Sequence, residues 1–188
     1  MQLTTGRLIA VACGVLMGVG VARAQQTAAL DPNRWEPTIQ KFEDAARYAA
    51  RYAARVVLPH APRVLVLYPG ENDIARGVKA DAIGASFQQL YGTVHTALPQ
   101  TRFVVIGLKP TPVRWQFDDE MRRANALIQG YCKTQAACVY VDVRPDMLGA
   151  DGKPKPELYV ADGEHMTPEG YKIWARLIRP VLQVEGRK

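Results

Sequence analysis

The stretch Val64-Leu65-Val66-Leu67-Tyr68-Pro69-Gly70-Glu71-Asn72-Asp73 decides the fold of this chain. Its first five residues form a short apolar run that follows Pro62 and ends at Pro69-Gly70. An uninterrupted apolar run between such boundaries is typical of a strand that is buried on both faces, as in a parallel sheet. We therefore predict a parallel strand at residues 64–68, with a polar turn directly after it.

Helices and strands alternate after this first strand. Apolar residues recur at helical spacing over residues 81–98 and 117–131, and the runs 103–106 and 139–143 resemble the first strand. Thr167 is a good N-cap for a last helix, with Pro168 at its first position. This alternation predicts an α/β fold with a parallel sheet and helices on both faces, and only three strands are recognisable.

The first 24 residues have the features of a secretory signal peptide. Arg7 provides a positive charge, residues 8–21 are apolar, and Ala22-Arg23-Ala24 is a small-residue cleavage site. The apolar run is shorter than the roughly 20 residues that a membrane span needs. We expect a secreted or periplasmic protein with no stable membrane anchor after cleavage.

The charge and the cysteines limit the possible partners and cofactors. Loss of Arg7 and Arg23 with the signal peptide would lower the formal net charge from +6 to +4. The basic residues are spread out and form no aromatic-interleaved stripe, so a nucleic-acid partner is not expected. Cys132 and Cys138 flank a short polar connection, and an oxidising compartment favours a disulfide between them. Metal binding is the weaker alternative because no His or third Cys lies nearby, and we expect no metal and no cofactor.

Two polar blocks carry the candidate chemistry. Gly70-Glu71-Asn72-Asp73 follows a strand, and ligands of open parallel sheets bind at the carboxyl ends of strands. The amide of Asn72 could donate to an oxyanion, although a polar turn in which Asp73 caps a helix explains these four residues equally well. In Asp162-Gly163-Glu164-His165, the carboxylate could orient the imidazole as a general base, although a surface loop is the simpler explanation of this block alone.

Taken together, the two blocks resemble the SGNH (GDSL-like) hydrolase superfamily of secreted esterases and acylhydrolases. Residues 70–73 look like the block that supplies the oxyanion donor, Asn72, with Gly70 and Asp73 in support. Residues 162–165, followed by Met166-Thr167-Pro168-Glu169-Gly170-Tyr171, look like the block that supplies the orienting Asp162 and the base His165. The resemblance implies a flavodoxin-like three-layer α/β/α sandwich and a small-molecule or polysaccharide ester as substrate.

The chain departs from this family between residues 43 and 52. The family places a strand with the nucleophilic serine there, followed by a block with an oxyanion glycine, whereas here Phe42-Glu43 passes almost directly into a later helix. We therefore divide the chain into a signal peptide (1–24), an N-terminal helical segment with an apparent internal deletion (25–60) and the α/β domain (61–188). The missing strand would leave residues 64–68 with an unpaired edge, covered by the helical segment 35–57 or by a second copy of the chain.

No residue is placed to act as the nucleophile. The chain contains a single serine, Ser86, which lies inside a predicted helix rather than on a sharp turn after a strand. Three hypotheses remain: an esterase whose catalysis is impaired, a non-catalytic relative that binds a carbohydrate or acyl ligand, and an internally deleted product without a function. A metal-dependent phosphodiesterase is the least supported, since no cluster of metal ligands is visible.

Overall fold

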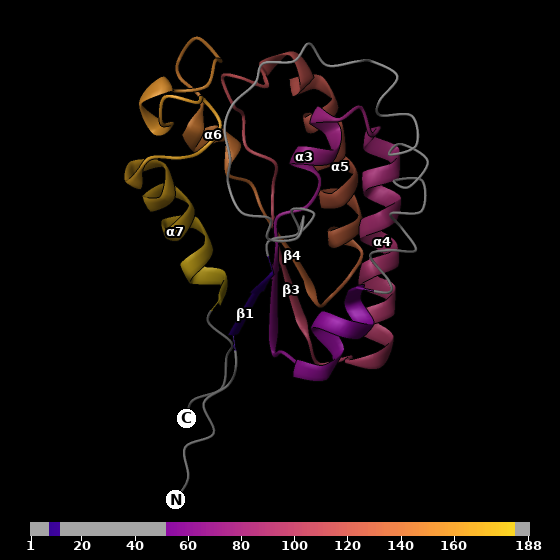
Figure 1. Ribbon diagram of the computed structural model, residues 1–188. Helices are drawn as coiled ribbons and strands as arrows, with labels where there is room; N and C mark the ends of the chain where they lie inside the picture. The colour runs from indigo at the N-terminus through magenta and orange to yellow at the C-terminus, as the bar shows by residue number, and fades with distance from the viewer. Residues whose placement is uncertain (1–7, 12–51, 183–188) are drawn as a thin grey trace, which may run out of the picture.

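A four-stranded parallel sheet forms the centre of the computed structural model, which describes residues 8–11 and 52–182 (Figure 1). The strands are β1 (Leu8–Val11), β2 (Val64–Leu67), β3 (Arg102–Ile106) and β4 (Cys138–Val141), and they lie side by side in this order. In the register of the sheet, Leu65 pairs with Phe103, and Phe103 pairs with Cys138. Because all strands are parallel, the loops that follow them meet at one edge.

Helices cover both faces of the sheet. α4 (Ala80–Ala97) and α5 (Asp118–Lys133) lie on one face, and α6 (Arg144–Met147) and α7 (Pro168–Leu182) lie on the other (Figure 1). The five-residue helix α3 (Glu71–Ala75) follows β2. The remaining helical turns are short: η2 (Ala53–Val57), η3 (Leu58–His60), η4 (Trp115–Phe117) and η5 (Pro156–Leu158).

Alternate residues of the strands face two separate cores. Leu65, Leu67 and Phe103 are buried with the apolar faces of α4 and α5. Val64, Val66 and Val104 are buried on the opposite face, where α7 packs. This burial on both faces explains why each strand reads as a continuous apolar run in the sequence.

The predicted α/β fold is confirmed as a three-layer, flavodoxin-like parallel sheet. The three strands expected at residues 64–68, 103–106 and 139–143 correspond to β2, β3 and β4. The predicted helix at 81–98 is α4, and the last helix begins at Pro168, with the Thr167 hydroxyl accepting a hydrogen bond from the amide of Gly170 at 3.4 Å.

A fourth strand fills the edge that we expected to be open, as long as residues 1–24 are part of the chain. β1 pairs with β2 over four residues, with Leu8 opposite Val64 and Val11 opposite Leu67. β1 therefore supplies the backbone partners that β2 would otherwise lack on this side. It is built from the apolar run that we assigned to a signal peptide. Cleavage after Ala24 stays a prediction, and most of residues 1–24 lie outside the described residues.

Other expectations meet the structure only in part. The N-terminal helical segment is described from residue 52 onward, where η2 and η3 form helical turns that end at His60, before β2 begins at Val64. The structure joins Cys132 and Cys138 in a disulfide between α5 and β4.

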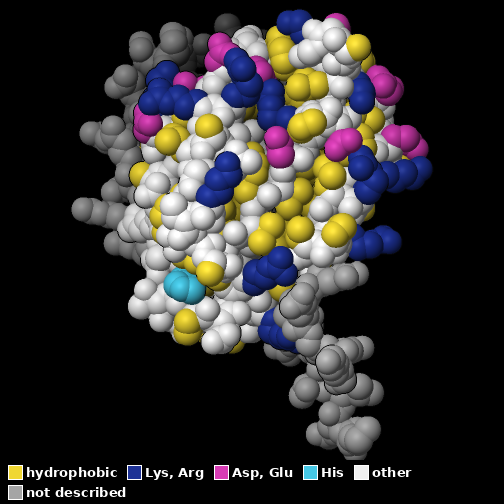
Figure 2. All heavy atoms as spheres, turned by 180° about the vertical axis from the view of Figure 1, so that it is seen from behind, with side chains coloured by type: hydrophobic (Ala, Val, Ile, Leu, Met, Phe, Trp, Pro, Cys, Tyr) yellow, Lys and Arg dark blue, Asp and Glu magenta, His cyan; other side chains and the backbone are white. Residues whose placement is uncertain are grey.

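Within residues 8–11 and 52–182, no helix is both long enough and apolar enough to cross a membrane. On the face shown in Figure 2, basic and acidic side chains are interleaved in the upper half, whereas the charged side chains of the lower half are basic.

Candidate active site

The turn after β2 positions Asn72. Gly70 has a φ of 95°, a left-handed conformation that L side chains rarely adopt, and an added Cβ would lie 2.7 Å from Ile83 Cγ2. The chain then enters α3 directly, so that Asn72 is the second residue of this helix at the carboxyl edge of the sheet. Asp73 lies inside the first turn of α3 and does not cap a helix, and its partial burial raises the pKa of its carboxyl. Gly70 is therefore required by the turn. The contacts of Asp73 within the described residues, which include an electrostatic interaction with Arg76, assign it no chemical role.

Asp162 and His165 form the hydrogen-bonded pair that their spacing predicts. Asp162 Oδ2 lies 2.6 Å from His165 Nδ1. Asp162 Oδ1 accepts hydrogen bonds from the backbone N–H groups of Glu164 and His165, at 2.8 and 2.9 Å. The loop is closed by a hydrogen bond of 2.9 Å from the amide of Val160 to the carbonyl of His165. This geometry orients the imidazole and leaves Nε2 outside the pair, as a general base requires.

The same contacts keep Asp162 ionised. The backbone N–H of Glu164, the His165 side chain and the His165 N–H all stabilise the carboxylate, and together they lower the pKa of Asp162 to about 2. Asp162 is therefore negatively charged at neutral pH. A charged carboxylate can hold the imidazole and stabilise it when it takes up a proton.

Arg114 joins the two candidate blocks, which are far apart in the sequence. Its Nη2 donates to Glu164 Oε1, next to His165, and its Nη1 lies 3.6 Å from Glu71 Oε1, next to Asn72. The second contact is an ion pair too long for a hydrogen bond. The amide of Val113 also donates to the carbonyl of Gly163 at 3.4 Å. Segment 107–115 therefore holds the loop of His165 beside the helix of Asn72.

A buried ion pair anchors the Asn72 side of this link. Lys109 Nζ lies 2.8 and 2.6 Å from the two carboxylate oxygens of Glu71, and both side chains are only 7% exposed. The Tyr68 hydroxyl donates to Glu71 Oε2 at 2.5 Å. Burial, and then the nearby charge of Glu71, raise the pKa of Tyr68 well above its usual value. The carboxylate of Glu71 thus has three polar partners around it in a site that is largely closed to water.

Asn125 fixes the start of the same segment from α5. Its Oδ1 accepts from the amide of Leu108 at 2.7 Å, and its Nδ2 donates to the carbonyl of Leu108 at 2.9 Å. Asn125 is buried, so this pair of hydrogen bonds is shielded from water. The segment between β3 and Trp115 is therefore held at both ends, by α5 and by the two candidate blocks.

The described residues contain no hydroxyl or thiol paired with His165. Ser86 lies within α4 and not at the end of a strand. Thr111 is buried, and its hydroxyl has no hydrogen-bond partner within residues 8–11 and 52–182. The Thr167 hydroxyl donates to the carbonyl of Glu157 at 3.1 Å, and Cys132 and Cys138 are oxidised. The same part of the chain holds no group of three or more His, Cys, Asp or Glu residues able to bind a metal ion.

Sequence reasoning missed the residues that connect the site. Glu71 and Glu164 are each one residue from a candidate residue, and Lys109 follows the predicted strand at 103–106, but none of them had an expected role. Arg114 has no local signal at all, since its partners Glu71 and Glu164 are 43 and 50 residues away in the sequence. Only an alignment or the tertiary structure could have identified it.

Comparison with known proteins gives one family match. The model of the GDSL-like lipase/acylhydrolase family matches residues 14–173, which is most of the chain. No curated protein matches the chain significantly in sequence.

Solved structures show the same fold at low identity. A GDSL-like lipase from Bacteroides thetaiotaomicron is 20% identical, with a TM-score of 0.60, over 80% of this chain and 82% of that one. A carbohydrate esterase of family 3 from Talaromyces cellulolyticus is 24% identical, with a TM-score of 0.59, over 75% of this chain and 65% of that one. An acetyl-xylooligosaccharide esterase from Geobacillus is 15% identical, with a TM-score of 0.60, over 78% of this chain and 71% of that one. The chain thus spans less than two thirds of the length of the Talaromyces enzyme.

Proposed function

Because the chain belongs to the GDSL-like lipase/acylhydrolase family, we propose that it carries an ester-hydrolase site for acylated small molecules or polysaccharides, with the catalytic step impaired. His165 is the general base, Asp162 orients it, and Asn72 is the side-chain donor to the oxyanion. The hydrogen bond of 2.6 Å between Asp162 Oδ2 and His165 Nδ1 is the observation that carries this proposal.

The roles follow from the chemistry of acyl transfer. A hydroxyl nucleophile would lose its proton to Nε2 of His165 as it attacks the ester carbonyl. The imidazolium that forms would be stabilised by the charged Asp162, and the amide of Asn72 would donate to the oxyanion of the tetrahedral intermediate. Water would then release the acyl group, with His165 again as the base.

The described residues offer no nucleophile beside His165, and this limits the expected activity. Ser86 is the only serine of the chain, and it lies within α4. Loss of the nucleophile of a catalytic triad costs about 10⁶ in turnover in a well-studied protease. We therefore expect the isolated chain to hydrolyse esters little faster than a variant that lacks the base.

Hydrolysis of p-nitrophenyl acetate, compared between the native chain and His165→Ala, tests this proposal. Labelling with a fluorophosphonate and mapping of any labelled residue by mass spectrometry is the companion experiment. We expect equal turnover by the two proteins and no label. Turnover that depends on His165, or a label on any residue including Ser86, would show that a competent nucleophile is present.

A non-catalytic function in ligand binding is the second candidate. The position of Ser86 within α4 favours it, because the rest of the site then has no attacking group to serve. Perturbation of the His165 imidazole NMR signals by acetate or an acylated sugar, without turnover, would support this function. If the chain were an internally deleted product without a function, we would expect neither ligand binding nor a stable fold.

A further inference from the structure

A pocket of about 360 Å³ opens at the carboxyl edge of the sheet, and neither candidate block contributes to it. We call it the Trp115 pocket; it is lined by Trp115, Asp118, Asp119, Arg122, Arg144 and Leu148. Its size falls in the range of roughly 300–1,000 Å³ that is usual for small-molecule sites. Trp115 and Asp118 follow β3 along the chain, and Arg144 follows β4, so two strand ends supply its walls.

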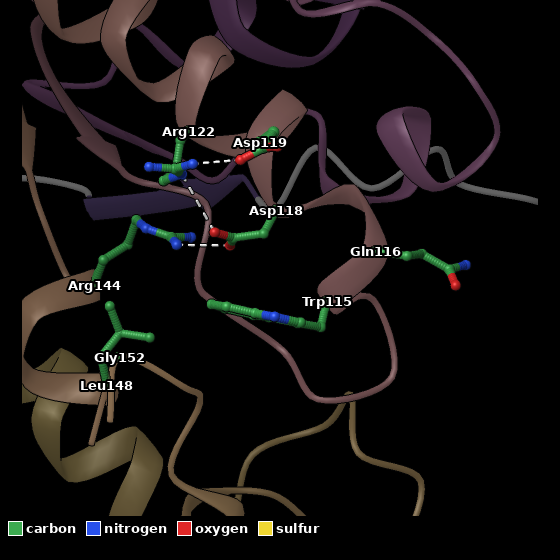
Figure 3. Close-up of a pocket in the computed structure, with 8 residues that line it drawn as sticks. All are labelled: Trp115, Gln116, Asp118, Asp119, Arg122, Arg144, Leu148 and Gly152. Carbon is green, nitrogen blue, oxygen red and sulfur yellow. Dashed lines mark hydrogen bonds and ion pairs between the residues drawn. The ribbon is translucent and has the colours of Figure 1, made fainter. Parts of the chain in front are cut away.

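Trp115 gives the pocket an aromatic surface. In Figure 3, its indole ring lies below the pair formed by Asp118 and Arg144 and is seen nearly edge-on, whereas Gln116 points away. The Nζ of Lys153 lies 4.8 Å from the centre of the ring. A half-buried Trp at the wall of a polar pocket offers a large apolar face beside hydrogen-bonding groups.

The charged groups of the pocket neutralise one another. Arg144 Nη2 donates to Asp118 Oδ1 at 2.6 Å, and Arg122 Nε lies 3.4 Å from Asp118 Oδ2. Arg122 Nη2 also donates to Asp119, at the exposed rim (Figure 3). Two guanidinium groups thus face two carboxylates. The charges of these four side chains balance, and Lys153 adds one positive charge over the Trp115 ring. Many hydrogen-bonding groups with little net charge favour a neutral ligand with many hydroxyl groups over an ion.

Arg144 retains a donor that the fold does not use. The residue is only 8% exposed, and its Nη1 has no hydrogen-bond partner within the described part of the chain. A buried donor without a partner is costly, so such groups point to a missing partner. Arg144 Nη1 is itself buried, so a ligand hydroxyl would accept from it after a small shift of the Arg144 side chain, while other hydroxyls would donate to the carboxylates of Asp118 and Asp119.

The Trp115 pocket is linked to the candidate active site through one residue. Arg114 contacts Glu164, beside His165, and the next residue along the chain is Trp115. A ligand that spans this segment could therefore present one end to His165 and another to the Trp115 pocket.

We propose that the Trp115 pocket binds a neutral sugar ring, stacked on Trp115 and hydrogen-bonded to the Asp118–Arg144 pair. If the proposed ester hydrolase is correct, the ring is the glycosyl part of an acylated carbohydrate; only this identification rests on the proposed function. The pocket then selects the alcohol side of the ester, and His165 faces the acyl side.

Binding of the unacylated neutral trisaccharide xylotriose tests the proposal without any catalytic step. Amide NMR titration of the full chain should show saturable shifts at Trp115 and Asp118, and the indole N–H signal of Trp115 should move. Trp115→Ala should weaken the apparent Kd at least tenfold, and Trp115→Phe should weaken it less. Tyr171→Ala, which removes an aromatic ring that is 54% exposed on α7, is the matched control and should leave the Kd unchanged.

The outcomes separate this inference from the proposed function. No shifts with xylotriose or cellotriose, in a chain that gives a folded spectrum, would overturn it. So would equal binding by Trp115→Ala, or tighter binding of charged trigalacturonate than of the neutral sugars. Sugar binding without ester turnover is the expected result and agrees with both the pocket and the impaired site. Sugar binding together with turnover that depends on His165 would leave the pocket assigned and reject only the impairment, whereas neither binding nor turnover would reject the pocket and leave the proposed function standing.

Discussion

Replacement of Lys109 by Met should lower the free energy of unfolding by about 3 kcal/mol, because it leaves the carboxylate of Glu71 buried without its nearest cation. Removal of one partner from a buried ion pair usually costs roughly 3–5 kcal/mol. Glu71 and Lys109 are each 7% exposed, and their charged atoms lie 2.6 Å apart. The lower end of the range applies, because Arg114 at 3.6 Å and the Tyr68 hydroxyl still face the carboxylate.

The double mutant separates the ion pair from the effect of either side chain alone. Glu71→Gln by itself leaves the ammonium group of Lys109 buried, so it should cost a similar amount. The combined variant buries neither charge without a partner. Its cost should therefore fall short of the sum of the two single costs by about 2 kcal/mol or more, as expected for residues in direct contact.

Urea unfolding followed by far-UV circular dichroism, with the disulfide intact, measures these costs. Lys172→Met is the matched control, because Lys172 is 75% exposed and pairs with Glu169 on the surface of α7. That change should stay within about 0.5 kcal/mol. A loss below about 1 kcal/mol for Lys109→Met, or additive costs in the double mutant, would refute the buried ion pair as an anchor of the Asn72 turn.

Four further predictions follow from the same structure. The pKa of Asp162, measured by carbon NMR, should be about 2, below the usual value of about 3.9 in an unfolded chain. The contribution of Asp162 to stability should therefore be complete above about pH 4 and be lost as the pH falls towards 2. An observed pKa near 4 would contradict this prediction. Arg114→Met should speed amide hydrogen exchange at His165 by tenfold or more while exchange in β3 stays unchanged, and equal protection of His165 would argue against the bridge. A chain that lacks residues 1–24 loses β1, so it should be less stable by roughly 2–4 kcal/mol and self-associate through the edge of β2. A monomer in light scattering with an unchanged urea midpoint would exclude this. Ser86→Ala should change neither stability beyond about 0.5 kcal/mol nor ester turnover, and a loss of turnover would identify Ser86 as the nucleophile.

Local patterns in the sequence were sufficient for most of the fold. β2, β3 and β4 were recognised because strands buried on both faces read as continuous apolar runs. The start of α7 was recognised from Thr167 and Pro168, whose effects are confined to one helical turn. β1 was missed for two reasons. A short apolar run near the start of a chain has the same composition as a signal peptide, and the strand with which β1 pairs is more than 50 residues away.

The contacts of the candidate site also fall into those that the sequence predicted and those that it did not. The pairing of Asp162 with His165 was predictable, because a three-residue spacing lets one carboxylate reach the imidazole and two backbone N–H groups within a single turn. The link between this pair and Asn72 was not, because Arg114 is joined to Glu71 and Glu164 only by the folding of the segment after β3. The sequence by itself thus determined the elements and the short-range chemistry, which depend on neighbours a few residues away. The tertiary structure alone decided the fourth strand, the buried ion pair and the Trp115 pocket, because each depends on groups that the chain brings together from distant positions.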